Sequence, residues 1–257
     1  MRAIKYSICI LTTALLLNCK GKQGDPGPMG ANGTTGPVLS GTINGVVTLT
    51  SSNGAQPVDR SGIVVKTNKG DSVLTNSSGS WSLPEVTGIY TLSFTKPGYG
   101  PSTVYGYNFV GGGDSHITNV ALSQVPNFSA TIVLDTTGGR STETKDLHIT
   151  MTLSLSSPQS QDVQFFVYYG DSTVSSTNYS GTTNIVVPAL QTTYKTTITG
   201  TNLQNSGIQP GQWVTIMAYP SSSSPALGSK YTDENTGRVI YTALGQPSMK
   251  QSCQVPF

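Results

Sequence analysis

The chain has 257 residues, of which only 10% are charged, against roughly a quarter in ordinary globular domains. It carries 14 basic and 12 acidic residues, and removal of residues 1–18 would take away Arg2 and Lys5 and leave 12 of each sign. A formally neutral chain lacks the long-range attraction to phosphate that nucleic-acid binding requires, so we expect no nucleic-acid partner.

The first 18 residues have the pattern of a secretory signal peptide. Arg2 and Lys5 provide a basic start, an apolar run extends to Leu17, and the polar Asn18 follows it. The apolar run is too short to cross a bilayer as a stable helix, which needs about 20 apolar residues. We therefore expect residues 1–18 to be removed from the mature protein.

Cys19 stands where the apolar run stops, after Leu16, Leu17 and Asn18. This order resembles the lipobox of bacterial lipoproteins. The resemblance implies cleavage before Cys19, acylation of that cysteine with chains such as palmitate, and attachment to a membrane. It also implies the outer membrane, because Lys20 differs from the Asp that retains lipoproteins of this family at the inner membrane. The alternative is an ordinary secretory signal in which Cys19 is incidental.

Glycine recurs at every third position from residue 21 to residue 36, which gives six Gly-x-y triplets over residues 21–38. Collagen has this period because only glycine fits on the shared axis of three chains. One interpretation is therefore a trimer with a short triple helix. The other, which we prefer for so few triplets, is an extended spacer of at most about 56 Å at the polyproline rise. Residues 19–38 thus form a linker whose oligomeric state stays open.

Residues 39–125 alternate apolar and hydroxyl side chains in short runs between turns rich in Gly, Pro, Asn and Ser. In residues 90–94, for example, Tyr90, Leu92 and Phe94 share one face. This period of two is typical of a half-buried strand, and no window after the signal has the period of an amphipathic helix. Strands are predicted over residues 43–50, 63–67, 72–75, 80–83 and 90–94. Their spacing predicts an antiparallel β-sandwich.

Several runs in this segment follow a characteristic order: residues 45–47, Pro57, and residues 62–65, 75–83, 88–94 and 96–99. In order and spacing they resemble the carboxypeptidase-regulatory-like family, whose fold is a transthyretin-type β-sandwich. The resemblance implies a non-catalytic module with a structural or recognition role.

Four aromatic residues lie close together in the sequence near the end of this segment: Tyr99, Tyr105, Tyr107 and Phe109. Aromatic side chains on loops stack against sugar rings or peptides, so Tyr99, Tyr105 and Tyr107 are candidate ligand contacts. Tyr105, Tyr107 and Phe109 also alternate, as the buried face of a strand would. We prefer burial in the core and keep ligand contact as the alternative.

Residues 126–245 continue the same pattern, with strands predicted over residues 128–134, 147–155, 163–169, 193–199, 213–219 and 238–243. Residues 208–218, which include Trp213, resemble the corner between the fifth and sixth strands of fibronectin type III domains. The resemblance implies an immunoglobulin-like sandwich. Residues 163–169 carry apolar or aromatic side chains on both faces. We prefer that both faces are covered, and the alternative is that one is exposed as a contact strip. Residues 246–257 are expected to be a short tail, in which Cys253 is a small buried residue or an intermolecular bridge.

The chain shows no short motif of an enzyme, a metal site or a cofactor site. His116, expected in a loop after three glycines, and His148 are its only histidines, and neither has the spacing of a zinc site. Asp135 and residues 233–235 have side chains that could ligate Ca²⁺ weakly, but they lack the spacing of a calcium loop, so a solvated turn is the preferred role. We therefore expect no catalytic residues, no cofactor and no metal.

Together these features predict an all-β chain, with two antiparallel β-sandwich domains after a signal peptide and a Gly-x-y linker. The favoured function is a non-enzymatic, lipid-anchored envelope protein that presents its sandwiches for structural or adhesive contact. Its expected partners are the membrane and an extracellular protein or glycan. The alternative is a glycan- or peptide-binding accessory module that uses exposed aromatic residues, and a hydrolase is the least favoured.

Overall fold

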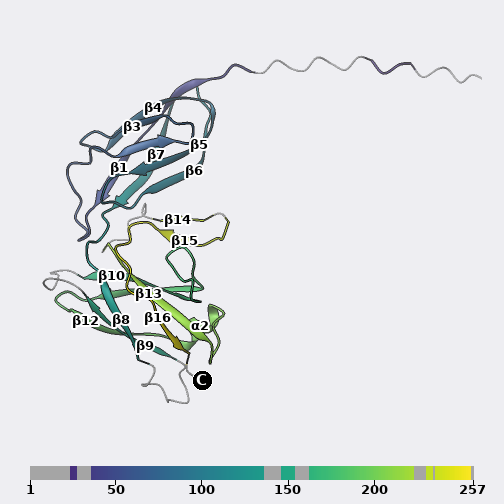
Figure 1. Ribbon diagram of the computed structural model, residues 1–257. Helices are drawn as coiled ribbons and strands as arrows, with labels where there is room; N and C mark the ends of the chain where they lie inside the picture. The colour runs from purple at the N-terminus through teal and green to yellow at the C-terminus, as the bar shows by residue number, and fades with distance from the viewer. Residues whose placement is uncertain are drawn as a thin grey trace, which may run out of the picture. The chain divides into compact units, whose positions relative to one another are not determined.

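The computed structural model describes residues 24–27, 36–135, 146–153, 162–222, 230–233 and 235–255. The expected signal peptide, Cys19 and most of the Gly-x-y linker lie outside these ranges. The chain divides into two compact units, Met1–Pro37 and Val38–Phe257. In the second unit, every described element except one short helix is a β-strand, and two separate cores mark two sandwiches (Figure 1). The all-β prediction is confirmed. No helix among the described residues has both the length and the apolar character needed to span a bilayer.

The first sandwich packs a three-stranded sheet against a four-stranded sheet. The first sheet has the order β4 (Ser80–Val86), β1 (Ser40–Thr50), β7 (Asp114–Ser123), and the second has the order β3 (Ser72–Leu74), β2 (Val64–Thr67), β5 (Gly88–Thr95), β6 (Ser102–Phe109). All pairs are antiparallel except β1 and β7, which run parallel. This pair departs from the purely antiparallel prediction. The strand before β7 in the chain is β6 of the facing sheet, so β7 joins β1 after a crossover between the sheets and not through a hairpin.

Alternate side chains of these strands meet between the two sheets. On β5, Tyr90, Leu92 and Phe94 are fully buried, as the period of two predicts. Trp81 of β4 meets Phe94 edge to face, with ring centroids 5.7 Å apart. Residues 39–125 contain no cysteine. Apolar burial, at roughly 25 cal/mol per Å², and backbone hydrogen bonds therefore hold this sandwich together.

The second sandwich packs a four-stranded sheet against a three-stranded sheet. The first has the order β11 (Gly181–Val187), β10 (Val163–Gly170), β13 (Trp213–Ser221), β16 (Gln251–Gln254), and the second has the order β12 (Thr193–Ile198), β9 (Leu147–Leu153), β8 (Ala130–Asp135). The short helix α2 (Gly200–Asn205) begins after Thr199, whose hydroxyl accepts a hydrogen bond from the Asn202 N–H. The strands β14 (Lys230–Thr232) and β15 (Val239–Tyr241) form a separate hairpin.

Strand β10 is buried on both faces, which confirms the prediction for residues 163–169. Its odd-numbered residues face the main core of the second sandwich. On the other side of the sheet, Phe166 and Tyr168 belong to a separate cluster, the second aromatic cluster. Tyr179 and Tyr241 pack against them there. Phe166 stacks on Tyr241 of β15 with ring centroids 3.9 Å apart. The hairpin and the loop after β10 therefore cover the face that a free sheet would expose.

Residues 246–257, expected to be a tail, instead contain the last strand of the second sandwich. Strand β16 pairs antiparallel with β13, and Cys253 and Val255 join the main core. The sequence signals this strand weakly, because Gln251, Ser252 and Gln254 are polar. The burial of Cys253 agrees with the first of the two roles expected for it.

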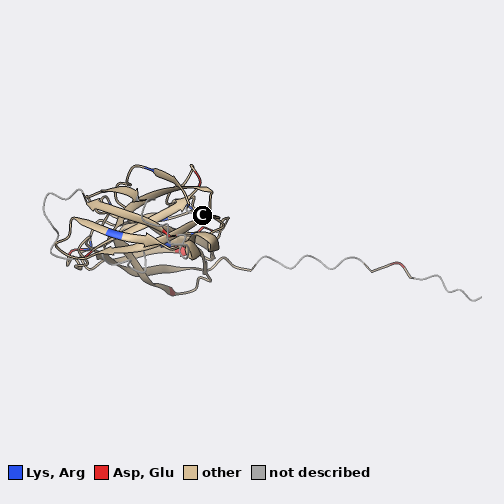
Figure 2. Cartoon of the chain, turned by 90° about the horizontal axis from the view of Figure 1, so that it is seen from below, with Lys and Arg blue, Asp and Glu red and all other residues tan. Residues whose placement is uncertain are grey.

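Charged residues are few on both sandwiches. Figure 2 shows the Lys, Arg, Asp and Glu residues of the described strands and loops as isolated positions instead of a band of one sign. This distribution agrees with the low charge content of the sequence.

Candidate functional site

A β-bulge in β6 turns Tyr105 out of the first sandwich. Val104 and Tyr107 pair with residues of β5 that are only two positions apart, so Tyr105 and Gly106 together stand opposite one residue. Gly106 has a φ of 61°, in the left-handed region that glycine adopts at little cost. Because the extra residue shifts the alternation, Val104 and Tyr107 both pack on the core while Tyr105 is 47% exposed.

The ring of Tyr105 lies against Tyr231 of β14. The two ring centroids are 6.0 Å apart and the ring planes are tilted by 53°. This separation is within the range of contacting aromatic pairs, about 4.5–7 Å. Tyr231 is half-buried, so the pair still offers ring surface to a ligand.

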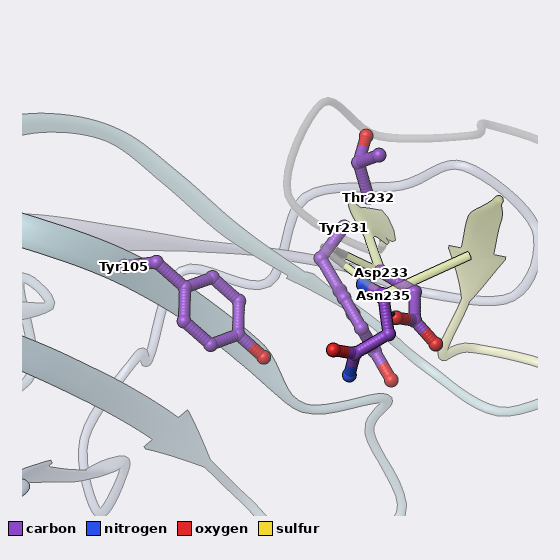
Figure 3. Close-up of a pocket in the computed structure, with 5 residues that line it drawn as sticks. All are labelled: Tyr105, Tyr231, Thr232, Asp233 and Asn235. Atoms are coloured by element: carbon purple, nitrogen blue, oxygen red, sulfur yellow. Dashed lines mark hydrogen bonds between the residues drawn. The ribbon is translucent and has the colours of Figure 1, made fainter. Parts of the chain in front are cut away.

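Asp233 and Asn235 belong to the turn that joins β14 to β15. The Oδ1 atom of Asp233 accepts hydrogen bonds from the backbone N–H groups of Asn235, at 2.8 Å, and Thr236, at 3.3 Å. The backbone N–H of Asp233 donates to the Arg238 carbonyl at 2.9 Å and closes the turn. One carboxylate oxygen therefore shapes the turn, and the turn presents the exposed Asn235 side chain next to Tyr231 (Figure 3).

These four residues and Thr232 line an open hollow of about 260 Å³, which we call the tyrosine hollow. Figure 3 shows the Tyr105 hydroxyl directed toward the side where Tyr231, Asp233 and Asn235 gather. The lining combines two aromatic rings with hydroxyl, amide and carboxylate groups. Its size and openness fit one ring-sized group of a surface-bound ligand better than an enclosed substrate.

Two close contacts occur next to the strands that carry the tyrosine pair. The Thr242 hydroxyl, just after β15, donates to the Pro101 carbonyl, just before β6, at 2.6 Å. Gly100 lies so close to the backbone of Thr242 and Ala243 that a Cβ atom there would be 2.5 Å away. Gly100 thus permits an approach that a larger residue would block.

Of the three tyrosines predicted as ligand contacts, Tyr105 alone lines the tyrosine hollow. Tyr107 is half-buried against the first core, and its hydroxyl forms a hydrogen bond with the Ser115 hydroxyl. Tyr99 also packs against this core and forms an isolated β-bridge with Gln124.

The expected burial of the alternating aromatic face holds for Phe109, holds in part for the half-buried Tyr107 and fails for Tyr105. The signal for this failure was present in the sequence, because a glycine inside a strand pattern often marks a bulge. No comparable signal pointed to Tyr231, which is remote in sequence.

Trp213 is a second exposed aromatic residue, with 70% of its surface accessible. It begins β13 and pairs with Gln254 of β16. At the position that resembles a fibronectin type III corner, the indole therefore faces solvent instead of the core.

The two histidines belong to different sandwiches. His116 lies in β7, where the sequence suggested a loop, and its Nδ1 is 2.7 Å from the Asn44 side-chain oxygen. His148 lies in β9, with its Nδ1 3.0 Å from the Thr197 hydroxyl. Across the described ranges, no group of three or more His, Cys, Asp or Glu residues could hold a metal ion.

No protein-family model matches this chain, and no curated protein sequence matches it. Among solved structures, a mutant type II cohesin–X-dockerin complex from Acetivibrio cellulolyticus is 21% identical, with a TM-score of 0.28, over 33% of this chain and 58% of that chain. The match thus spans less than two thirds of that chain.

Two DUF3823 family proteins match over more of the chain. The protein from Parabacteroides merdae is 13% identical, with a TM-score of 0.25, over 72% of this chain and 92% of that chain. The protein from Bacteroides ovatus is 12% identical, with a TM-score of 0.30, over 84% of this chain and 99% of that chain. Similarities this low show neither a shared family nor a shared ligand.

Proposed function

We propose that this chain is a non-enzymatic, lipid-anchored protein of the cell envelope that uses its β-sandwiches to hold an extracellular glycan. The lipobox-like run that ends at Cys19 supports the lipid anchor. The Gly-x-y linker supports a spacer between the membrane and the sandwiches. The observation that supports binding is the tyrosine hollow, in which an outward-turned Tyr105 meets Tyr231 beside polar side chains.

The chemistry of the tyrosine hollow suits a saccharide. The C–H face of a sugar ring packs on an aromatic ring, and the surrounding hydroxyl groups need donors and acceptors at its edge. Asn235 supplies both a donor and an acceptor, and the two tyrosine hydroxyls supply further ones. The sparse charge of the chain favours a neutral glycan over a strongly charged one.

A binding role also agrees with how the candidate catalytic groups are placed. General base catalysis needs a base within hydrogen-bond reach of the group that it activates. His116 and His148 lie in strands of different sandwiches, and the tyrosine hollow contains neither. Asp233 is the one carboxylate among the described residues that line the hollow, and it already accepts two backbone hydrogen bonds.

The anchor is tested in cells. Globomycin, which blocks lipoprotein signal peptidase, should cause a precursor to accumulate, and Cys19→Ala should move the protein to the soluble fraction. Mass spectrometry of the natural protein should find a diacylglycerol-modified Cys19 at its N-terminus. An unmodified N-terminus, or retention of Cys19→Ala at the membrane, would refute the anchor.

The binding role is tested separately with residues 19–257 carrying Cys19→Ser, screened on a glycan array. We expect one reproducible ligand class whose binding weakens at least about tenfold in Tyr105→Ala and in Tyr231→Ala, in line with the energy of an aromatic contact. Trp213→Ala is the matched control, since it removes an exposed aromatic residue outside the hollow. A ligand that depends on Trp213 and not on Tyr105 would contradict the assignment of the site.

A further inference from the structure

We propose that three copies of this chain associate through an apolar collar on the first sandwich, which consists of Leu39, Val86, Ile89 and Val110. The proposal concerns assembly and does not depend on the identity of any glycan. Three observations support it: the exposure of these side chains, the hydrogen bonds that join the backbone segments next to them, and the sequence that precedes Leu39.

All four collar residues are aliphatic and exposed, and Ile89 and Val110 are 67% and 68% accessible. Exposed aliphatic residues that are scattered singly need no explanation, whereas a group of them marks a contact surface. Leu39 directly precedes β1 and Val110 directly follows β6, whereas Val86 ends β4 and Ile89 is the second residue of β5.

Backbone contacts bring these segments to one end of the sandwich. The Thr87 N–H donates to the Leu39 carbonyl at 2.8 Å, and the Thr87 hydroxyl donates to the Phe109 carbonyl at 3.1 Å. Ser40 pairs with Val86 in the β1–β4 ladder. Thr87 therefore ties the residues next to Leu39, Val86 and Val110 to one another.

Gly111 brings the last segment even closer to Leu39. It has a φ of 72°, and a Cβ atom at this position would lie 2.5 Å from the Leu39 carbonyl oxygen. The next residue, Gly112, donates its N–H to the Ser40 carbonyl at 2.9 Å. These glycines hold the backbone that directly follows Val110 against Leu39 and Ser40.

The partner of this surface follows from the residues that precede it. The six Gly-x-y triplets end at Val38, one residue before the collar begins. Such a repeat forms a triple helix only with two further chains, and six triplets recover little of the entropy lost when three chains are ordered. Association of three collars around a threefold axis would bring the three linkers together and allow them to wind.

Trimer formation would also change how the protein binds. Three tyrosine hollows on one assembly raise the effective concentration of sites near a repetitive ligand. Sites that are weak singly would then bind a polymer tightly.

The test uses residues 19–257 with Cys19→Ser in sedimentation equilibrium. We expect a species of three times the chain mass, and a circular dichroism signal of a triple helix that melts as the trimer dissociates. In Ile89→Lys/Val110→Lys, burial of two charged groups should raise the dissociation constant at least about a hundredfold and abolish the triple-helix signal.

Leu74→Lys/Leu190→Lys is the control, because these two aliphatic residues are equally exposed outside the collar. It should remain a trimer, and both double variants should keep the melting temperature of the sandwiches. A monomeric parent chain would overturn the proposal. So would a collar variant that stays trimeric while Gly27→Ala/Gly30→Ala dissociates, because the linker alone would then drive association.

Discussion

Tyr105 and Tyr107 are two positions apart in β6, yet Tyr107 packs on the first core while Tyr105 lies against Tyr231 outside it. In a regular strand, residues two apart share a face. The bulge at Gly106 separates them, so the left-handed conformation of one glycine places Tyr105 in the tyrosine hollow.

We therefore expect Gly106→Ala to destabilise the protein by about 1 kcal/mol, because an L-residue pays this cost in the left-handed region. Gly113→Ala is a matched control. Apart from the neighbours in the chain, no atom of the described residues lies within 4 Å of a Cβ added at either glycine, and of the two only Gly106 has a positive φ. Urea unfolding of both variants measures the difference. Equal free energies of unfolding would show that the bulge does not require glycine.

The second aromatic cluster contains a buried hydroxyl that forms no hydrogen bond with the described part of the chain. Tyr168 is fully buried, its hydroxyl has no partner among those residues, and burial raises the pKa of this phenol well above its usual value. We expect Tyr168→Phe to leave stability unchanged or to raise it by about 1 kcal/mol, since the unpaired hydroxyl costs free energy in the folded state.

Tyr90→Phe supplies the comparison. Tyr90 is equally buried, but its hydroxyl donates to the Val86 carbonyl at 2.7 Å. Its removal should cost about 1 kcal/mol, because it leaves a carbonyl without its donor. In chemical denaturation, the free energy of unfolding should therefore be clearly lower for Tyr90→Phe than for Tyr168→Phe. A matching loss in Tyr168→Phe would mean that its hydroxyl is hydrogen-bonded in solution.

The sequence predicted those parts of the fold that depend on local periodicity. Alternation in residues 90–94 identified β5 and its buried face, and residues 163–169 identified a strand covered on both sides. Where periodicity is interrupted, the prediction failed. Gly106 shifted the alternation of β6, and the polar residues of β16 concealed a strand whose Cys253 is in the core.

The tyrosine hollow was predictable only in part. Tyr105 could be identified as an aromatic candidate, because it lies in an aromatic run rich in glycine. Tyr231 and Asn235 could not, since they meet Tyr105 through long-range packing that no short motif encodes. The parallel pairing of β1 with β7 was missed for the same reason.

Burial of Cys253 should make stability depend on pH in the alkaline range. Burial raises the pKa of its thiol from 9.0 to about 11. Well below pH 9 the thiol is protonated in both the folded and the unfolded chain, so its burial contributes fully to the free energy of unfolding. Between pH 9 and 11 the unfolded chain loses the proton while the folded chain keeps it, so stability falls as pH rises.

We expect residues 19–257 with Cys19→Ser to lose about 1 to 2 kcal/mol more between pH 8 and pH 10.5 than the same chain with Cys253→Ala. Urea unfolding at the two pH values measures this, and the tyrosines cancel in the difference. Identical pH dependence of the two chains would place the thiol in contact with water.

Trp213 provides a fluorescent reporter, because the chain has only two tryptophans and they differ in exposure. Trp213 is 70% exposed, whereas Trp81 is 4% exposed in the first core. Iodide should quench the red-shifted emission of Trp213, and Trp213→Phe should leave a blue-shifted emission that resists iodide. Undiminished quenching in Trp213→Phe would contradict the burial of Trp81. The same measurement separates the two exposed aromatic sites, since a saccharide held in the tyrosine hollow leaves Trp213 open to iodide, and one that shields Trp213 binds elsewhere.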